Sequence, residues 1–131
     1  MIYGIGVDVV YIPRIKQLYE RWRRRFLKRI FTVDEINHCL RRKSPWPELA
    51  ARIGAKEAFA KAVGLGWRQG LHWKLIEVKN LPSGQPILCL YGRASEICKQ
   101  NGLRSQVTLT HDGHYAVAVV VLYRAIKGEE E

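Results

Sequence analysis

The stretch PELAARIGAKEAFAKAVGLG, residues 47–66, decides how this 131-residue chain is organised. It is rich in Ala, begins with Pro and an early Glu, and ends in Gly64 and Gly66. These features predict one helix that starts with proline and ends in a glycine cap.

Glu57 stands on the apolar stripe of this helix, which recurs at helical spacing through Leu49, Ile53, Glu57 and Ala60. A carboxylate in that position needs a partner. Lys61 lies four residues on, and one interpretation is an ordinary Glu–Lys helix pair worth about 0.2–0.5 kcal/mol. The other interpretation is a ligand site.

Residues 2–12 precede the helices and are rich in Ile, Val and Tyr on both parities, the pattern of a strand covered on both faces. Asp8 interrupts the pattern, and a buried, unpaired charge would cost several kcal/mol. Asp8 therefore either forms a salt bridge with an arginine or belongs to a ligand-binding site. The run GIGVD, residues 4–8, lacks the third glycine before a helix and so does not predict a dinucleotide fold.

Residues 13–30 predict a basic helix or helix pair that begins at Pro13. Trp22 and Phe26 fall on its apolar stripe and are expected in the core. The rest of the segment is basic, with Glu20 as the single acidic residue between positions 14 and 29. Thr32 and Glu35 have the spacing of a capping box, which opens a short helix through residue 40.

In the second half of the chain the spacing of apolar residues changes from the helical period of about 3.6 toward the period of two that is typical of strands. We expect a hairpin of strands 73–79 and 87–91, a short helix over 92–101, a strand around 107–111 and a last strand over 115–123. Residues 129–131 are expected to be a frayed tail. These elements predict a single α+β domain, residues 1–131, with helices packed on a mainly antiparallel sheet.

The composition excludes several classes of protein. The 22 Lys+Arg against 12 Asp+Glu give a net charge of +10, which favours an anionic partner. The three cysteines form no CxxC pair, which argues against a disulfide framework and a thiolate zinc site. No apolar run approaches the ~20 residues of a membrane helix. We therefore expect a soluble, cytoplasmic protein.

Two carboxylates from different elements, Asp8 and Glu57, could together hold Mg²⁺ with phosphate oxygens. Arg52, Lys56 and Lys61 lie close to Glu57 on the predicted helix and could bind further phosphate oxygens; the alternative for them is a solvated basic face. His111 ends a strand, where its imidazole could contact a phosphate or nucleobase or be a half-buried structural group.

Taken together, these residues resemble the bacterial holo-acyl-carrier-protein synthase family, the short class of 4′-phosphopantetheinyl transferases, over nearly the whole length. The motifs that carry the resemblance are GIGVD (4–8), RIFT (29–32) with Glu35, ARIGAKEAFAK (51–61) with Gly64 and Gly66, GQP (84–86), and TLTH (108–111) before Ala116 and Ala118. Two motifs depart from the family pattern. Ile53 replaces a usual aromatic, and TLTH replaces S-x-S-H.

The resemblance implies transfer of the phosphopantetheine arm from coenzyme A to a serine of apo acyl carrier protein, with release of 3′,5′-ADP. It implies a Mg²⁺ ion on Asp8 and Glu57, catalysis by these two residues with Lys61, and a homotrimer with sites between subunits. The serine proton would go to a metal-bound water or to a carboxylate. The residues it places on coenzyme A are Arg52, Lys56, Lys61, Gly64, Gly66, Thr110 and His111.

Acyl carrier proteins are acidic, so the basic N-terminal helix is expected to dock them electrostatically. The residues assigned to this contact are Arg14, Arg21, Arg24, Arg25 and Lys28. Two other classes stay open. A nucleic-acid-binding module would use the same basic cluster but gives Asp8 and Glu57 no role, and a catalytically inactive scaffold subunit would keep the fold without turnover.

Overall fold

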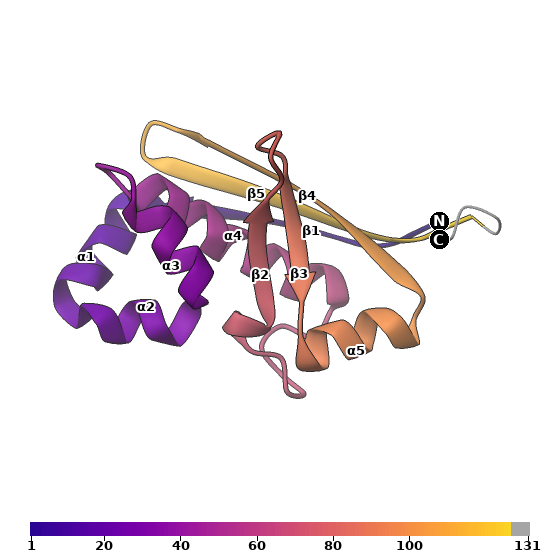
Figure 1. Ribbon diagram of the computed structural model, residues 1–131. Helices are drawn as coiled ribbons and strands as arrows, with labels where there is room; N and C mark the ends of the chain where they lie inside the picture. Colours follow the sequence, from indigo (N-terminus) through magenta and orange to yellow (C-terminus); the bar gives the residue numbers. More distant parts are fainter. Residues whose placement is uncertain (127–131) are drawn as a thin grey trace.

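The computed structural model describes residues 1–126, in which five helices and five strands follow the predicted order (Figure 1). The predicted tail, residues 129–131, lies outside the described residues. The elements are β1 (Ile2–Tyr11), α1 (Ile12–Trp22), α2 (Arg24–Ile30), α3 (Val33–Leu40), α4 (Trp46–Val63), the short 3-10 helix Trp73–Leu75, β2 (Ile76–Asn80), β3 (Pro86–Leu90), α5 (Gly92–Gln100), β4 (Leu103–Asp112) and β5 (Tyr115–Arg124).

The strands form two antiparallel sheets. β5 is the central strand of the larger one, in the order β1-β5-β4, and β2 pairs with β3 as the predicted hairpin. In the larger sheet Asp8 lies opposite Ala118, which lies opposite Leu109 on the far strand. The prediction of an α+β fold with a mainly antiparallel sheet is confirmed.

α4 lies across one face of β1 and β5 and is buried on most of its circumference. It ends as predicted, because Gly64 adopts a φ of 89° and its N–H caps the helix on Ala60 and Lys61 carbonyls. The approach to β1 is close. A Cβ on Gly6 would lie 1.8 Å from the Ala58 carbonyl oxygen, so the glycines of the GIGVD run serve helix–strand packing. This packing brings Asp8 against α4.

The three N-terminal helices gather at one end of the molecule (Figure 1). The basic segment is a helix pair, because Arg23 takes a φ of 51° and breaks it between α1 and α2. The capping box of α3 is present in both directions: the Glu35 N–H donates to Thr32 Oγ1, and the Thr32 N–H donates to Glu35 Oε1.

Two predictions about the strands are wrong. The hairpin begins at Ile76 rather than at Trp73, because residues Trp73–Leu75 form a 3-10 turn whose Trp73 carbonyl accepts a hydrogen bond from Lys56. β1 is covered on one face only in the single chain. Ile5 and Val9 are each 59% exposed and Val7 is 51% exposed, because α4 packs on the opposite face.

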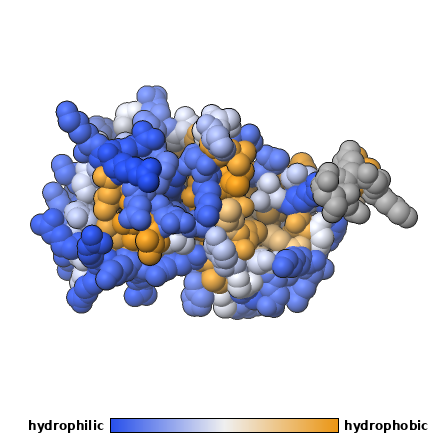
Figure 2. Space-filling model, in the orientation of Figure 1, coloured by the Kyte–Doolittle hydropathy of each residue, from blue (hydrophilic) through white to orange (hydrophobic). Residues whose placement is uncertain are grey.

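Hydrophilic side chains dominate the helical end of the surface in the orientation of Figure 1, with smaller hydrophobic areas between them (Figure 2). This agrees with the eight Lys and Arg residues counted between positions 14 and 29. Among the described residues, no helix combines the length and the apolar character needed to cross a membrane.

Candidate active site

Asp8 lies in the middle of β1 and pairs with a cation on α4. Lys61 Nζ donates to Asp8 Oδ1 at 3.0 Å and to the Val7 carbonyl at 3.0 Å. The partner of Asp8 is therefore a lysine, and the alternative of an arginine salt bridge is wrong. Lys61 also turns toward Asp8 rather than forming the Glu–Lys helix pair considered for Glu57. The pair is open to solvent, because Lys61 is 54% exposed.

Glu57 is half-buried on α4, one turn before Lys61. The pKa of its carboxyl group is raised above the usual 4.5, mainly because burial disfavours the charged form. The Trp67 side chain acts in the opposite direction and lowers this pKa. The charge of Asp8 raises it further, and the charge of Lys61 lowers it. The influence of Asp8 shows that the two carboxylates are close enough to repel each other. α4 and β1 thus place the two carboxylates within electrostatic range of each other, and their joint binding of a metal ion stays a prediction.

Two neighbouring carboxylates suit a hard divalent cation. Their mutual repulsion is relieved when a cation lies between them, and Mg²⁺ is commonly held by one or two carboxylates with water and phosphate oxygens at the other positions. Within residues 1–126, no group of three or more His, Cys, Asp or Glu side chains gathers to enclose a metal ion. An ion on Asp8 and Glu57 would therefore keep most of its positions for other ligands.

Three of the predicted coenzyme-binding residues line one cavity of about 180 Å³. Arg52 contributes from α4, and Thr110 and His111 contribute from the end of β4. Arg52 is only 2% exposed, donates to Glu48 at 3.2 Å and to Asn80 at 2.8 Å, and leaves its buried Nε without a partner. The fixed, buried guanidinium at the wall makes this cavity a candidate anion site.

The β2–β3 hairpin also lines this cavity, through Asn80, Gly84 and Pro86 around its turn. Asn80 Nδ2 donates to the Gly84 carbonyl at 3.0 Å, which holds the turn in place. Asn80 was not among the predicted site residues. Its polar side chain at the end of a strand, just before the GQP motif, was the signal that could have indicated it.

Lys56 has a different environment from the one predicted. Its side chain is 0% exposed, and Nζ donates to Glu35 Oε1 at 2.8 Å, to the Ile76 carbonyl at 2.5 Å and to the Trp73 carbonyl at 3.1 Å. An ammonium has three protons, so all its donors are used inside the protein. Lys56 ties α4 to α3 and the hairpin, and this geometry does not support its assignment to a phosphate. The alternative, a solvated basic face, is also wrong for Lys56 and Arg52.

Gly64 and Gly66 follow α4 with φ angles of 89° and 61°. A Cβ added to either would meet nothing within 4 Å, so the backbone there is open on the side that a side chain would fill. The structure explains Gly64 as a helix cap. Contact of either glycine with coenzyme A stays a prediction.

The five residues predicted to bind the carrier protein are all exposed at the helical end: Arg14, Arg21, Arg24, Arg25 and Lys28. The prediction for Trp22 is wrong, because it is 45% exposed while Phe26 is 7% exposed. The break at Arg23 turns Trp22 off the buried side. The guanidinium groups of Arg21 and Arg25 lie 5.1 and 5.8 Å from its ring centroid.

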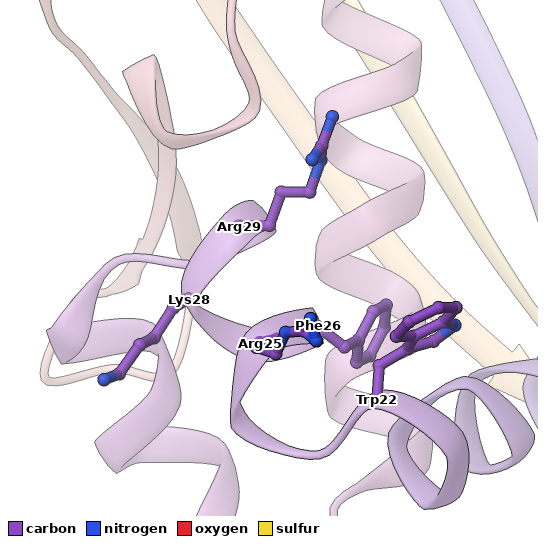
Figure 3. A pocket seen from close by; sticks show the side chains of 5 residues that line it. All are labelled: Trp22, Arg25, Phe26, Lys28 and Arg29. Atoms are coloured by element: carbon purple, nitrogen blue, oxygen red, sulfur yellow. The ribbon is translucent and has the colours of Figure 1, made fainter.

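Trp22 also lines an open cavity of about 620 Å³ together with Arg25, Phe26, Lys28 and Arg29 (Figure 3). Figure 3 shows the two aromatic rings near each other, whereas Lys28 and Arg29 extend away from them. An exposed indole rimmed by cations offers both an apolar contact and positive charge to a partner.

Comparisons with family models, with relatives by sequence and with solved structures all point to the same family. The family model of the 4′-phosphopantetheinyl transferase superfamily matches residues 4–120. The chain is 42% identical over 123 residues to a holo-[acyl-carrier-protein] synthase of Syntrophus aciditrophicus, covering 93% of this chain and 96% of that one.

Solved structures of the same family are also similar. The holo-[acyl-carrier-protein] synthase of Neisseria meningitidis has a TM-score of 0.86 at 35% identity, covering 95% and 100% of the two chains. The one from Bacillus anthracis, solved with CoA (3′,5′-ADP), has a TM-score of 0.80 at 32% identity, covering 95% and 99%. By sequence and by fold, this chain belongs to the 4′-phosphopantetheinyl transferase superfamily, in the family of holo-[acyl-carrier-protein] synthases.

Proposed function

We propose that this protein transfers the 4′-phosphopantetheine arm of coenzyme A to a serine of an apo acyl carrier protein. The observation that carries the proposal is the pair Asp8 and Glu57 meeting beside Lys61, in a chain similar over nearly its whole length to holo-[acyl-carrier-protein] synthases. We further propose that it works in the cytoplasm and supplies carrier protein for fatty acid biosynthesis.

In this reaction the serine oxygen forms a bond to the phosphorus that bears the pantetheine arm, and the bond from that phosphorus to the bridging oxygen breaks. The electron pair leaves with 3′,5′-ADP, and the serine gives up its proton. Phosphoryl transfer of this kind depends on positioning and charge neutralisation rather than on a protein nucleophile. No nucleophilic side chain is needed at the site.

The charges at the site suit these demands. Bound to Asp8 and Glu57, Mg²⁺ would neutralise the diphosphate oxygens of coenzyme A. The Lys61 ammonium lies beside Asp8, is 54% exposed and can approach a phosphate oxygen of the same diphosphate. We therefore assign Asp8 and Glu57 as metal ligands and Lys61 as the cation that binds substrate.

We assign the cavity of Arg52, Thr110 and His111 to the 3′,5′-ADP portion of coenzyme A. Arg52 and Glu57 lie on the same helix, about 7.5 Å apart along its axis and about 140° apart around it. The assignment therefore rests on the groups that line the cavity and not on its distance from Glu57. The buried guanidinium of Arg52 and the imidazole of His111 offer hydrogen-bond donors for phosphate and base.

To test the reaction, the protein is incubated with apo acyl carrier protein, coenzyme A and Mg²⁺. The mass of the carrier protein is then measured by mass spectrometry. The carrier is expected to gain the mass of one phosphopantetheine arm, and omission of Mg²⁺ is expected to suppress the gain. An unchanged carrier mass across Mg²⁺, Mn²⁺ and several carrier proteins would exclude this function.

We propose that an acidic carrier protein docks on the basic surface, formed by Arg14, Arg21, Arg24, Arg25 and Lys28. Its charges are exposed, and Trp22 adds an apolar contact at its centre. Nucleic acid is a poorer occupant. Binding of nucleic acid at this surface would give Asp8 and Glu57 no role.

Reversing charge on this surface, in the double variant Arg21→Glu with Arg24→Glu, is expected to lower kcat/KM for the carrier protein by about tenfold or more. The loss should lie mainly in KM and grow at low salt, because screening weakens exposed charge pairs at high salt. The control Lys99→Glu, on the exposed end of α5, should leave kcat/KM within about twofold of wild type. Equal losses in both variants would contradict docking at this surface.

We propose that the exposed face of the larger sheet is covered by other copies of the chain in a homotrimer. Ile5, Val7 and Val9 lie on that face of β1, and half-buried Val119 on β5 lies opposite Val7. A row of exposed β-branched side chains is unusual on an isolated monomer. In such an assembly a neighbouring subunit would complete each site.

Val7→Lys is expected to break the assembly, because it would bury an unpaired ammonium at the centre of the interface. Sedimentation velocity should move from about three times the 15.1 kDa chain mass toward the chain mass, with turnover falling in parallel. Val33→Lys, at a position 72% exposed on α3, is the matched control and should sediment like wild type. A wild-type protein that sediments as a monomer at micromolar concentration would overturn the trimer.

A further inference from the structure

The loop after α4 carries Trp67, a residue outside the predicted site. Its ring stacks on that of Trp73, with centroids 4.1 Å apart and planes inclined by 32°. Trp67 also packs against the buried cluster that includes Phe59 and Ala55 on α4. Stacking and packing together hold the indole in one orientation.

The indole N–H of Trp67 is a buried donor without a hydrogen-bond partner in the part of the chain that the structure describes. Nε1 is buried, and no acceptor meets it in full hydrogen-bond geometry. A buried donor left unpaired costs about 1–3 kcal/mol, so the group needs an acceptor. The Trp67 side chain is close enough to Glu57 to lower the pKa of its carboxyl group, which makes Glu57 the candidate acceptor. Within residues 1–126, no other side chain donates a hydrogen bond to Glu57.

The other half of the tryptophan pair is tied to the same turn of α4. The Trp73 carbonyl accepts a hydrogen bond from Lys56 Nζ at 3.1 Å, and Lys56 immediately precedes Glu57. Lys56 is in turn held by Glu35 at 2.8 Å. Lys56 therefore ties the stacked pair of tryptophans, through Trp73, to the residue of α4 that precedes Glu57.

We propose that Trp67 is a positioning residue for Glu57, whose indole N–H engages one carboxylate oxygen and leaves the other for the divalent cation. The inference rests on the metal site of the proposed function. Groups that hydrogen-bond to a ligating side chain commonly change metal affinity by 10–100-fold when removed, because they orient the ligand. Trp67 thus adds a contact that neither Asp8 nor Lys61 provides.

Trp67→Phe tests the N–H directly, because the ring and its stack on Trp73 are kept. Binding of Mn²⁺ is measured by electron paramagnetic resonance in the presence of coenzyme A and without carrier protein, so that no turnover occurs. We expect Trp67→Phe to bind Mn²⁺ about tenfold more weakly. Trp73→Phe keeps the indole of Trp67 and should change affinity less than about twofold. Wild-type affinity in Trp67→Phe, or an equal loss in both variants, would overturn the inference.

A second measurement needs no metal. The indole N–H of Trp67 is assigned in a ¹H–¹⁵N spectrum as the signal missing from Trp67→Phe. Glu57→Gln should shift that signal and leave those of Trp22 and Trp46 unchanged. A signal that does not respond to Glu57→Gln refutes the contact even when Mn²⁺ binds. A signal that responds in a protein that binds no Mn²⁺ supports the contact and refutes the proposed metal site instead.

If Trp67→Phe fails to fold by circular dichroism, Trp67 is replaced by benzothienylalanine, which has the shape of tryptophan without its N–H. The same roughly tenfold loss of Mn²⁺ affinity is expected. Unchanged affinity in that folded variant would overturn the inference.

Discussion

Glu57→Gln and Asp8→Asn are each expected to lower turnover about a thousandfold while the protein stays folded. Each change keeps the shape of the side chain and removes a negative charge that a divalent cation needs. A metal ion supplies several kcal/mol of charge stabilisation in phosphoryl transfer, and each 1.36 kcal/mol corresponds to a factor of ten in rate. The folded state is spared because neither carboxylate belongs to the fully buried network around Lys56.

The measurement is the initial rate of carrier-protein modification, with mass spectrometry as readout and circular dichroism as the check on folding. Glu96→Gln is the matched control. This carboxylate is exposed on α5, where it pairs with Arg93 at 2.7 Å, so its removal should leave the rate unchanged. Full activity in both site variants would refute the metal assignment.

Gly6→Ala is expected to destabilise the protein by about 3 kcal/mol or more, the upper end of the cost of overpacking. The added Cβ would lie 1.8 Å from the Ala58 carbonyl oxygen and 3.0 Å from the Ala62 nitrogen, and both are backbone atoms of α4. α4 cannot retreat easily, because its far side is held by Lys56 hydrogen bonds to α3 and the hairpin.

Urea unfolding followed by circular dichroism measures this loss. Gly113→Ala is the control, because a Cβ there meets nothing within 4 Å. Its φ of 58° carries a cost of only about 1–2 kcal/mol for a residue with a Cβ. If Gly6→Ala unfolded at the wild-type midpoint, β1 and α4 could separate at little cost, and the close placement of Asp8 would need another explanation.

Local signals predicted most of the fold. The capping box of Thr32 and Glu35, the glycine cap at Gly64 and the alternation of the last two strands depend on near neighbours, and all are found in the structure. The start of the hairpin was missed. Trp73 and its neighbours look like a strand locally, but the carbonyl of Trp73 binds a lysine from a distant turn of α4.

The candidate site was predictable only in part. Asp8 and Glu57 were conspicuous because carboxylates in apolar patterns are costly, and in the structure the charge of Asp8 acts on Glu57. The separation of Lys56 from Lys61 was not predictable, since both look like cations on one helix. Trp67 carried no signal at all, because it lies in a loop without periodicity.

The sequence by itself determined which elements form and which side chains could not be buried without a partner, because helix caps, periodicity and desolvation costs act over a few residues. Only the tertiary structure decided which partners these side chains have: Lys61 for Asp8, and Glu35 for Lys56. Those pairings depend on how closely β1 approaches α4 and how the hairpin closes on its far side. Such distances arise from packing between segments remote in the chain.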